Sequence, residues 1–321
     1  MSVLKFCLGL LLVLLLPATG IAQSSYPTHP VRLIVGFGPG AAADLTARVL
    51  GQRLSKTMGQ QFVVENKPGG GSTVAAEQVA RAPKDGYTLF VGTAANVING
   101  VIQPNLPFDF ARDFAPIAYT TSSPNILVVH PSTGVSDVKG LIALAKTKPE
   151  QIFFGSSGVG TAPHLSGELF NMMAGTKMVH VPYSGSAQAV TDLLAGRIQV
   201  MFSPASTVLQ YVASGQLKAL ASSELTRAAA APDLPTVAEA GLPGFDTSVW
   251  FGIVGPAGMP RETVEALSRA INEALKAEEV MKPLHAAGLD IKGGTPEAFG
   301  AYIASETKKW NDVVTTAGLR N

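Results

Sequence analysis

Two glycine-rich loops carry the groups in this sequence that are best suited to bind an anion. Residues 38–44 (GPGAAAD) and residues 158–164 (GVGTAPH) each follow a short apolar run and precede a helical pattern. A glycine-rich turn at the start of a helix exposes backbone N–H groups at the positive end of the helix dipole. Two such loops about one domain length apart indicate two lobes that hold one anionic ligand, although each could also be an ordinary strand-to-helix turn.

Side chains in and near these loops could take part in binding or catalysis. Asp44 and His164 each lie at the start of a predicted helix, where either could bind a ligand or serve as an acid or base. Their alternative roles are structural, because a first-turn carboxylate completes a helix N-terminus and a lone histidine commonly donates a hydrogen bond. The hydroxyl groups of Ser157 and Thr161 could bind a carboxylate. The ring of Tyr183 could pack on a ligand or in the core.

The first loop also matches the dinucleotide-binding pattern G-x-G-x-x-A. Residues 38–43 follow a predicted strand and precede a helix, and Glu65 ends the next predicted strand, as in a Rossmann nucleotide site. Two features count against this interpretation. Pro39 stiffens the turn that must surround the pyrophosphate, and an exported protein rarely meets nicotinamide cofactors. We therefore expect no cofactor.

Other catalytic and nucleic-acid-binding patterns are absent from the sequence. It contains no G-x-S-x-G, no H-E-x-x-H and no G-x-x-x-x-G-K-[ST], and its 5 histidines are scattered. Those patterns are typical of serine hydrolases, zinc proteases and P-loop proteins. The 24 Lys and Arg residues balance 23 Asp and Glu residues without a basic stripe, so a nucleic-acid partner is not expected. The sequence predicts a binding protein with no metal and no catalytic residue.

The N-terminal residues are predicted to be an export signal. An apolar run over residues 6–16 follows Lys5, and small residues lead to a predicted cleavage after about Ala22, as in a secretory signal peptide. Cleavage would remove Cys7, the only cysteine, and leave about 300 residues, enough for two domains. No later apolar run reaches the roughly 18 residues of a membrane helix. We expect the mature chain to be periplasmic, without insertion into the membrane.

Apolar runs alternate with helical patterns along most of the chain, which favours doubly wound α/β layers. Several runs are nearly continuous in Val, Ile, Leu and Phe, as parallel strands buried on both faces are. The main predicted strands are Arg32–Val35, Gln61–Glu65, Tyr87–Gly92, Ile126–His130, Gln151–Phe154, Met178–Val181, Gln199–Phe202 and Leu217–Ser222. The predicted helices between them are Asp44–Met58, Ser72–Ala82, Val135–Lys146, Ala162–Met173, Ser186–Ala195 and Ser206–Ser214.

The C-terminal part is predicted to be mainly helical. Helices are expected over residues 260–276, from about Glu278 to Gly288, and from the N-cap Thr295 onward, with short strands at residues 251–254 and 289–291. These helices most simply pack back onto the first lobe. We therefore expect lobe 1 to comprise residues 23–121 and 225–321, and lobe 2 to comprise residues 122–224. Two crossings, near residues 118–124 and 222–235, would form a hinge about which the lobes close.

A series of short motifs in a fixed order gives the chain a recognisable pattern. The motifs are residues 30–35 (PVRLIV), 64–69 (VENKPG), 84–89 (KDGYTL), 113–117 (DFAPI), 181–183 (VPY) and 235–241 (PTVAEAG). In these motifs the chain resembles the solute-binding proteins of the tripartite tricarboxylate transporters, the Bug (Bordetella uptake gene) family. The resemblance extends over essentially the whole mature chain. It implies a two-lobed periplasmic-binding-protein fold that holds an organic acid in its cleft and delivers it to a membrane permease.

The resemblance also implies which residues contact the ligand. In that family, backbone groups of two opposed loops and bridging waters hold a ligand carboxylate without an arginine. In the first lobe the implied contacts are Phe37, Gly38, Gly40, Ala41, Asp44, Gly71, Ser72 and Thr93. In the second lobe they are Ser157, Gly160, Thr161, His164, Tyr183, Ser184, Phe202 and Ser203.

Two departures from the family pattern affect the ligand rather than the fold. Residues 41–43 are alanines, where the family usually has two adjacent glycines with a nearby Ser or Thr. Ser203 stands where an aspartate is common, which predicts a less acidic pocket. The sequence does not choose among mono- or dicarboxylates, or between aliphatic and aromatic acids.

Three functional hypotheses follow from the sequence. The leading one is a monomeric periplasmic carboxylate receptor that serves a membrane permease. The second is an exported enzyme that acts on a small acid, with Asp44 or His164 as acid or base. The third is a sensory binding protein that docks on a signalling partner; it shares the fold and ligand of the first hypothesis, so only the partner separates the two.

Overall fold

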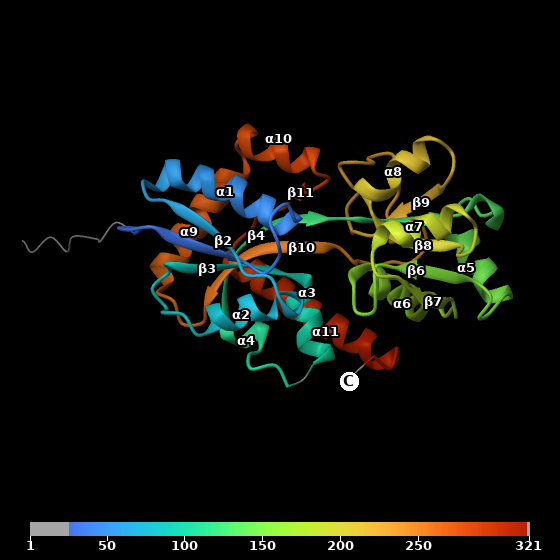
Figure 1. Ribbon diagram of the computed structural model, residues 1–321, viewed down its shortest axis with the longest axis horizontal. Coiled ribbons are helices and arrows are strands. Elements are labelled where there is room, and N and C mark those ends of the chain that lie inside the picture. The colour runs from blue at the N-terminus through green and yellow to red at the C-terminus, as the bar shows by residue number, and fades with distance from the viewer. Residues whose placement is uncertain (1–25, 104, 320–321) are drawn as a thin grey trace, which may run out of the picture.

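The computed structural model describes residues 26–103 and 105–319 (Figure 1). The predicted signal peptide and its cleavage site lie outside the described residues. No helix in the described ranges is both long enough and apolar enough to span a bilayer. Two sheets form the two halves of the molecule, which lie side by side in Figure 1.

The first sheet combines strands from both ends of the chain. Its 6 strands have the order β11-β4-β10-β3-β1-β2. The strands are β1 (Val31–Val35), β2 (Phe62–Asn66), β3 (Thr88–Thr93), β4 (Phe114–Ser123), β10 (Val249–Pro256) and β11 (Asp290–Ile291). Strands β1, β2 and β3 pair in parallel, so the loops that follow them leave the same edge of the sheet.

The second sheet uses the middle of the chain. Its 5 strands have the order β7-β6-β8-β5-β9. The strands are β5 (Asn125–Val129), β6 (Phe153–Ser156), β7 (Val179–Pro182), β8 (Val200–Pro204) and β9 (Lys218–Ser222). Strands β6, β7 and β8 pair in parallel, so the second glycine loop, after β6, leaves one edge with the loops after β7 and β8.

Helices cover both sheets. In the first half they are α1 (Ala42–Met58), the short 3-10 turn η1 (Gly70–Ser72), α2 (Thr73–Ala80), α3 (Ala94–Ile102) and α4 (Phe110–Asp113). In the second half they are η2 (Pro131–Thr133), α5 (Val138–Thr147), α6 (Ala162–Ala174), α7 (Ser186–Leu194) and α8 (Ala205–Ala213). The C-terminal helices are α9 (Arg261–Leu275), α10 (Glu278–Ala286) and α11 (Pro296–Thr316).

The α/β architecture with two flanked sheets is confirmed, but the sheets are mixed rather than wholly parallel. Strand β10 pairs antiparallel with β3 and β4, and β5 pairs antiparallel with β8 and β9. The continuous apolar runs correctly indicated burial on both faces. Burial does not fix direction, however, because an interior antiparallel strand is as apolar as a parallel one.

Strand β4, helices α3 and α4, and the two 3-10 turns η1 and η2 were not predicted. The C-terminal part of β4, which is rich in Thr and Ser, lies where a crossing was expected near residues 118–124. Those side chains are buried and hydrogen-bonded: Thr120 Oγ1 donates to Phe251 O at 2.8 Å, and Thr121 Oγ1 lies 3.1 Å from Thr46 Oγ1. Internal partners therefore allow a polar strand to lie inside the sheet.

The chain passes between the sheets where β4 ends at Ser123 and β5 begins at Asn125. It leaves the second sheet at Ser222 and enters the first again at Val249. The segment between contacts both halves. Phe245 stacks on Phe202 of β8 with ring centroids 5.6 Å apart, whereas Ala229 N donates to the Asp290 carboxylate of β11 at 3.1 Å.

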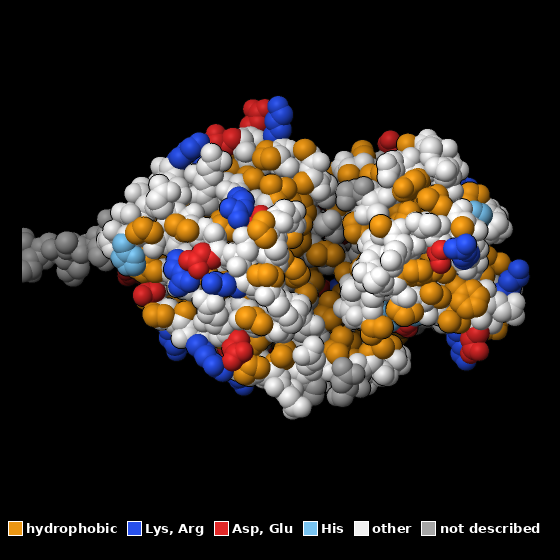
Figure 2. Space-filling model, in the orientation of Figure 1, with side chains coloured by type: hydrophobic (Ala, Val, Ile, Leu, Met, Phe, Trp, Pro, Cys, Tyr) orange, Lys and Arg blue, Asp and Glu red, His pale blue; other side chains and the backbone are white. Residues whose placement is uncertain are grey.

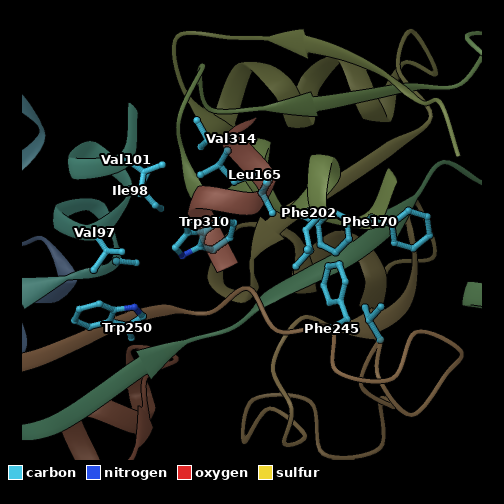
Figure 3. Close-up of a cluster of buried hydrophobic side chains, with 14 of the residues drawn as sticks. Val97, Ile98, Val101, Leu165, Phe170, Phe202, Phe245, Trp250, Trp310 and Val314 are labelled. Carbon is cyan, nitrogen blue, oxygen red and sulfur yellow. The ribbon is translucent and has the colours of Figure 1, made fainter. Parts of the chain in front are cut away.

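The largest hydrophobic cluster extends across both halves (Figure 3). It joins Trp250 of β10 and Trp310 of α11 to Leu165 of α6 and Phe202 of β8. The C-terminal helix α11 therefore packs on the second half as well as the first, beyond the predicted packing on the first lobe alone. This shared core brings the start of α6, and with it the second glycine loop, toward the first half.

Candidate functional site

The first glycine loop is organised by Asp44. Gly40 has a positive φ of 84°, which favours glycine, and its N–H donates to Asp44 Oδ2 at 2.9 Å. Ala41 N donates to Gly38 O at 3.3 Å, closing the turn, and α1 starts at the next residue. Asn66 Nδ2 donates to Asp44 Oδ1 at 2.8 Å, so the end of β2 also supports the loop.

The charge of Asp44 is held in place by its neighbours. Arg48, one turn further along α1, donates from Nε to Asp44 Oδ2 at 3.0 Å. Burial of the carboxyl opposes its ionisation, but the hydrogen bonds from Arg48, Gly40 and Asn66 outweigh burial and lower the pKa of Asp44 below its usual value. Asp44 is thus an ionised acceptor whose bonds are directed into the loop.

The second glycine loop repeats this geometry with a different acceptor. Gly160 has a φ of 76°, and its N–H donates to His164 Nδ1 at 3.0 Å. Thr161 N donates to Gly158 O at 3.3 Å, and Thr161 Oγ1 donates to the same carbonyl at 2.7 Å. Helix α6 starts directly afterwards, at Ala162.

Because of these bonds, the N–H groups of Gly40 and Gly160 are occupied within their own loops. The donors left for a ligand lie in the first turns of α1 and α6, whose leading N–H groups have no acceptor within the helix. Ala41, the N-cap of α1, has no polar side chain to cap them, and the Thr161 hydroxyl donates to Gly158 O instead. Pro163 has no backbone N–H, so the first turn of α6 offers one donor fewer than that of α1.

His164 is buried against a second histidine. Its ring stacks on that of His180 with centroids 3.8 Å apart, and its Nε2 lies 3.6 Å from Glu168 Oε1. His180 Nε2 lies 2.7 Å from Ser156 Oγ. Burial and the proximity of His164 lower the pKa of His180 to about 4, so His180 is neutral at neutral pH.

The turn after β2 forms a third part of the site. Gly70, Gly71 and Ser72 all have positive φ values, and that of Ser72 is 80°, an uncommon conformation for a residue with a side chain. Ser72 is 1% exposed, and its Oγ has no hydrogen-bond partner in the described part of the chain. Asn99 Nδ2 of α3 donates to Gly71 O at 2.9 Å and holds the turn.

Thr93 proves to be a helix cap. Its N–H donates to Asn96 Oδ1 at 2.9 Å, and its side chain takes part in a reciprocal capping box at the start of α3. Thr93 was expected from the resemblance to contact the ligand, and the helix that it caps was not predicted. Thr93 nevertheless lies at the same sheet edge as the first loop.

The other predicted contact residues of the second half differ in whether their side chains already have a partner within the protein. The Tyr183 hydroxyl donates to Asp192 Oδ2 at 2.8 Å, and burial followed by this bond raises the pKa of Tyr183 to about 12. Ser184 Oγ lies 2.6 Å from Gln188 Oε1. The Phe202 ring belongs to the core, whereas Ser203 is fully buried and its Oγ is unpartnered within the described ranges.

The two glycine loops and the turn after β2 thus leave the loop-bearing edges of the two sheets, and Figure 2 shows a groove between the two halves. Ile102, at the end of α3, reaches toward the second loop: its Cδ1 lies 3.3 Å from the position that a Cβ would take on Gly160. Sequence reasoning missed Ile102, Asn66 and Asn99. Over the described ranges, no three His, Cys, Asp or Glu side chains are grouped to hold a metal ion.

Comparison with protein families decides the classification. The family model described as "Tripartite tricarboxylate transporter family receptor" matches residues 46–319. The chain belongs to this receptor family. The resemblance seen in the sequence motifs is therefore confirmed, and the exported-enzyme hypothesis is set aside because the family consists of solute-binding receptors.

Members of this receptor family resemble the chain along most of its length. Protein BugT of Bordetella pertussis is 33% identical, over 94% of this chain and 94% of its own length. The R. palustris protein Rpa4515, solved with adipate, is 35% identical with a TM-score of 0.72 and covers 91% of this chain and 98% of its own. MatC of Rhodopseudomonas palustris, solved with bound malate, is 29% identical with a TM-score of 0.69, over 90% and 100% of the two chains.

Proposed function

We propose that this receptor is periplasmic, binds a small organic carboxylate between its two halves and delivers it to membrane permease subunits of the tripartite tricarboxylate type. The observation that carries the proposal is the repeated loop geometry. Gly40 and Gly160 lie in matching turns before α1 and α6, whose first turns have no side-chain cap, and a groove separates the two halves that carry these turns (Figure 2). Helix N-termini of this kind bind anions.

The ligand class follows from the donors. The guanidinium of Arg48 is already paired with Asp44, so backbone N–H groups rather than a free cation would meet the carboxylate. Two or three charge-assisted hydrogen bonds at about 1.5–3 kcal/mol each, with about 1–2 kcal/mol from the helix ends, approach the roughly 8 kcal/mol of a micromolar complex. The costs of binding reduce this sum, and burial of the ligand's carbon chain offsets them.

The first test is thermal unfolding of the protein with adipate, malate, other organic acids, amino acids and sugars. A ligand that binds only the folded state raises the melting temperature by mass action. We expect an acid to raise it and the matching amide to leave it unchanged. Equal effects of an acid and its amide, or a response to sugars alone, would contradict carboxylate binding. Refolding the protein before the assay removes any ligand that co-purifies.

A proline substitution tests the helix N-terminus itself. Ala42 is the first residue of α1, a position that accepts proline, so Ala42→Pro removes one N–H and leaves the helix intact. We expect the affinity for the acid to fall roughly tenfold or more, the value of one charge-assisted bond. The matched control is Glu278→Pro at the first residue of α10, whose N-cap backbone is likewise extended; this variant should bind as the wild type does.

A further inference from the structure

The two glycine loops share their backbone geometry but differ in the chemistry that fixes it. In the first loop the acceptor of the glycine N–H is a carboxylate oxygen, Asp44 Oδ2 at 2.9 Å. In the second it is a ring nitrogen, His164 Nδ1 at 3.0 Å. Each acceptor lies four residues after the glycine. A carboxylate and an imidazole respond differently to acid, so the two loops need not respond together.

We propose that His164 is a positioning residue that holds the second loop in its binding conformation only while its imidazole is neutral, so that mild acid loosens this loop and not the first. The change in the loop is a property of the ligand-free protein. Its consequence for affinity rests on the proposed function.

The reason lies in the lone pair of Nδ1. A neutral imidazole that accepts at Nδ1 carries its proton on Nε2, and protonation makes both ring nitrogens donors. The Gly160 N–H would then face an N–H at 3.0 Å and lose its acceptor. Asp44 keeps its lone pairs over the same pH range, because its hydrogen bonds lower the pKa of the carboxyl. Histidine is the side chain whose charge ordinarily changes between about pH 5 and 8.

The groups around His164 support the neutral tautomer that accepts at Nδ1. Glu168 of α6 faces its Nε2 at 3.6 Å, where an N–H is needed, and so supports the Nδ1-acceptor tautomer. His180 of β7 stacks on the ring but has a pKa of about 4. Strands β6 and β8, which also pack on α6, carry no ionisable side chain.

The remaining element packed on α6 is α11. Of its ionisable side chains, Glu306 pairs with Lys309 and Lys308 pairs with Asp312 at 2.7 Å. Glu297 lies in the first turn of the helix, and the Tyr302 hydroxyl lies 3.3 Å from Ser248 Oγ. None of these pairs involves His164. The Gly160 N–H, the His180 ring and the Glu168 carboxylate are thus the polar groups that face His164.

The direct test follows the backbone N–H groups of the two glycines in the ligand-free protein. Labelling glycine with ¹⁵N restricts the NMR spectrum to the glycine resonances, and a second sample labelled with ¹⁵N at histidine reports the protonation of the His164 ring. From about pH 8 to about pH 5, we expect the Gly160 resonance to shift in one step that coincides with protonation of His164. Its hydrogen exchange, corrected for pH, should become at least about fivefold faster, as loss of one hydrogen bond predicts. The Gly40 resonance is the internal control and should not move.

Substitution of His164 supplies the matched variants. In His164→Asn, Oδ1 is bonded to Cγ as Nδ1 is in histidine, so an acceptor is retained at every pH. His164→Asp places a carboxylate four residues after Gly160, as Asp44 is after Gly40, and replaces the asparagine variant if that variant folds poorly. Either variant should abolish the step at Gly160. A Gly160 resonance that stays fixed while His164 titrates, or that still shifts in both variants, would overturn the proposal.

Ligand affinity gives a second test, in which failure of the proposed ligand class can be told apart from failure of the role proposed for His164. If adipate or malate binds, its affinity should fall between about pH 7.5 and 5.5 in the wild type but stay nearly constant in His164→Asn. An affinity that rises in acid would show that cationic His164 attracts the carboxylate and would overturn the inference. If neither acid binds, the proposed ligand class is at fault, while the NMR experiment still decides the role of His164.

Discussion

The position that a Cβ atom would take on Gly36 lies 1.8 Å from Oγ of Ser72. Gly36 follows β1, and Ser72 ends the glycine-rich turn after β2. The two segments can approach so closely only because one residue has no side chain. Ser72 itself has a φ of 80° and a buried hydroxyl that is unpartnered within the described chain. This contact connects the first loop to the turn beside it.

Gly36→Ala should therefore destabilise the protein by about 1–3 kcal/mol, the range for an overpacked site. Ser72→Gly should be close to neutral, since glycine adopts a positive φ without strain and the variant also removes an unpartnered hydroxyl. Combining the two should recover part of the loss, because the added methyl group then meets no side chain, although it still lies 2.8 Å from Ser72 Cα. Urea unfolding of the four proteins measures the coupling between the sites, and additive effects would contradict the contact.

Asp44→Asn should cost about 1–3 kcal/mol of stability, since its amide group would face donors from Gly40, Arg48 or Asn66 and leave some without acceptors. The pKa of Asp44 is lowered in the folded state. Its stabilisation is therefore present above the unfolded pKa of about 3.9 and is lost as pH falls through the folded pKa. Unfolding measured at several acidic pH values should show a smaller loss in the variant.

Asp192→Asn is the matched control for this prediction. Asp192 also has a lowered pKa and accepts hydrogen bonds from Arg197 and Tyr183. Its partner Arg197 is largely exposed, and surface pairs contribute little. If Asp192→Asn lowers the free energy of unfolding as much as Asp44→Asn does, the hydrogen bonds within the first glycine loop do not explain the contribution of Asp44 to stability.

The sequence predicted the loops and strands of the site well because local patterns encode them. All eight main predicted strands are present, each within a few residues of its predicted bounds. Local patterns could not predict which backbone N–H groups of the loops already donate to side chains of the protein. The bonds from Gly40 to Asp44 and from Gly160 to His164 depend on side-chain directions at the helix start, and a first-turn Asp or His is compatible with several roles.

Long-range features were the least accessible to sequence reasoning. Ile102 lies far from residues 158–164 in the chain, and its approach to Gly160 depends on how the two halves pack. The antiparallel entry of β10 between β3 and β4 likewise depends on pairing between distant segments. Such pairings leave little local signal, because a strand's apolar pattern records its burial and not its neighbours.

Glu306 is expected to be a major determinant of stability away from the groove. Its Oε2 accepts from Trp250 Nε1 at 3.1 Å and from Trp310 Nε1 at 3.0 Å, and Lys309 pairs with the same carboxylate. Glu306→Leu would leave two buried indole N–H groups without an acceptor and Lys309 with the Asp246 carbonyl but no carboxylate, which should cost about 3–5 kcal/mol.

Glu306→Gln separates the two kinds of partner in this cluster, because its amide oxygen still accepts from an indole while the ion pair is lost. We expect Glu306→Gln to lose less stability than Glu306→Leu. Thermal unfolding ranks the three proteins, and near-ultraviolet circular dichroism reports the tryptophan environment. Equal losses in the two variants would assign the stabilisation to Lys309 rather than to the indole bonds.

A substitution at Ser203 can separate an effect on ligand affinity from an effect on the stability of the protein. It stands at the end of β8, is fully buried, and has an Oγ without a partner in the described chain. Removing such a hydroxyl should leave the unliganded protein equally stable or slightly more stable, since no internal bond is lost. If the hydroxyl serves the ligand, Ser203→Ala should weaken carboxylate binding by about five- to tenfold.

The matched control is Ser222→Ala, because Ser222 ends β9, is equally buried, and also has an unpartnered Oγ among the described residues. It is not one of the residues expected to contact the ligand, so its removal should change neither melting temperature nor affinity appreciably. Isothermal titration with the acid found in the thermal assay compares the two variants. Equal affinities would remove Ser203 from the site.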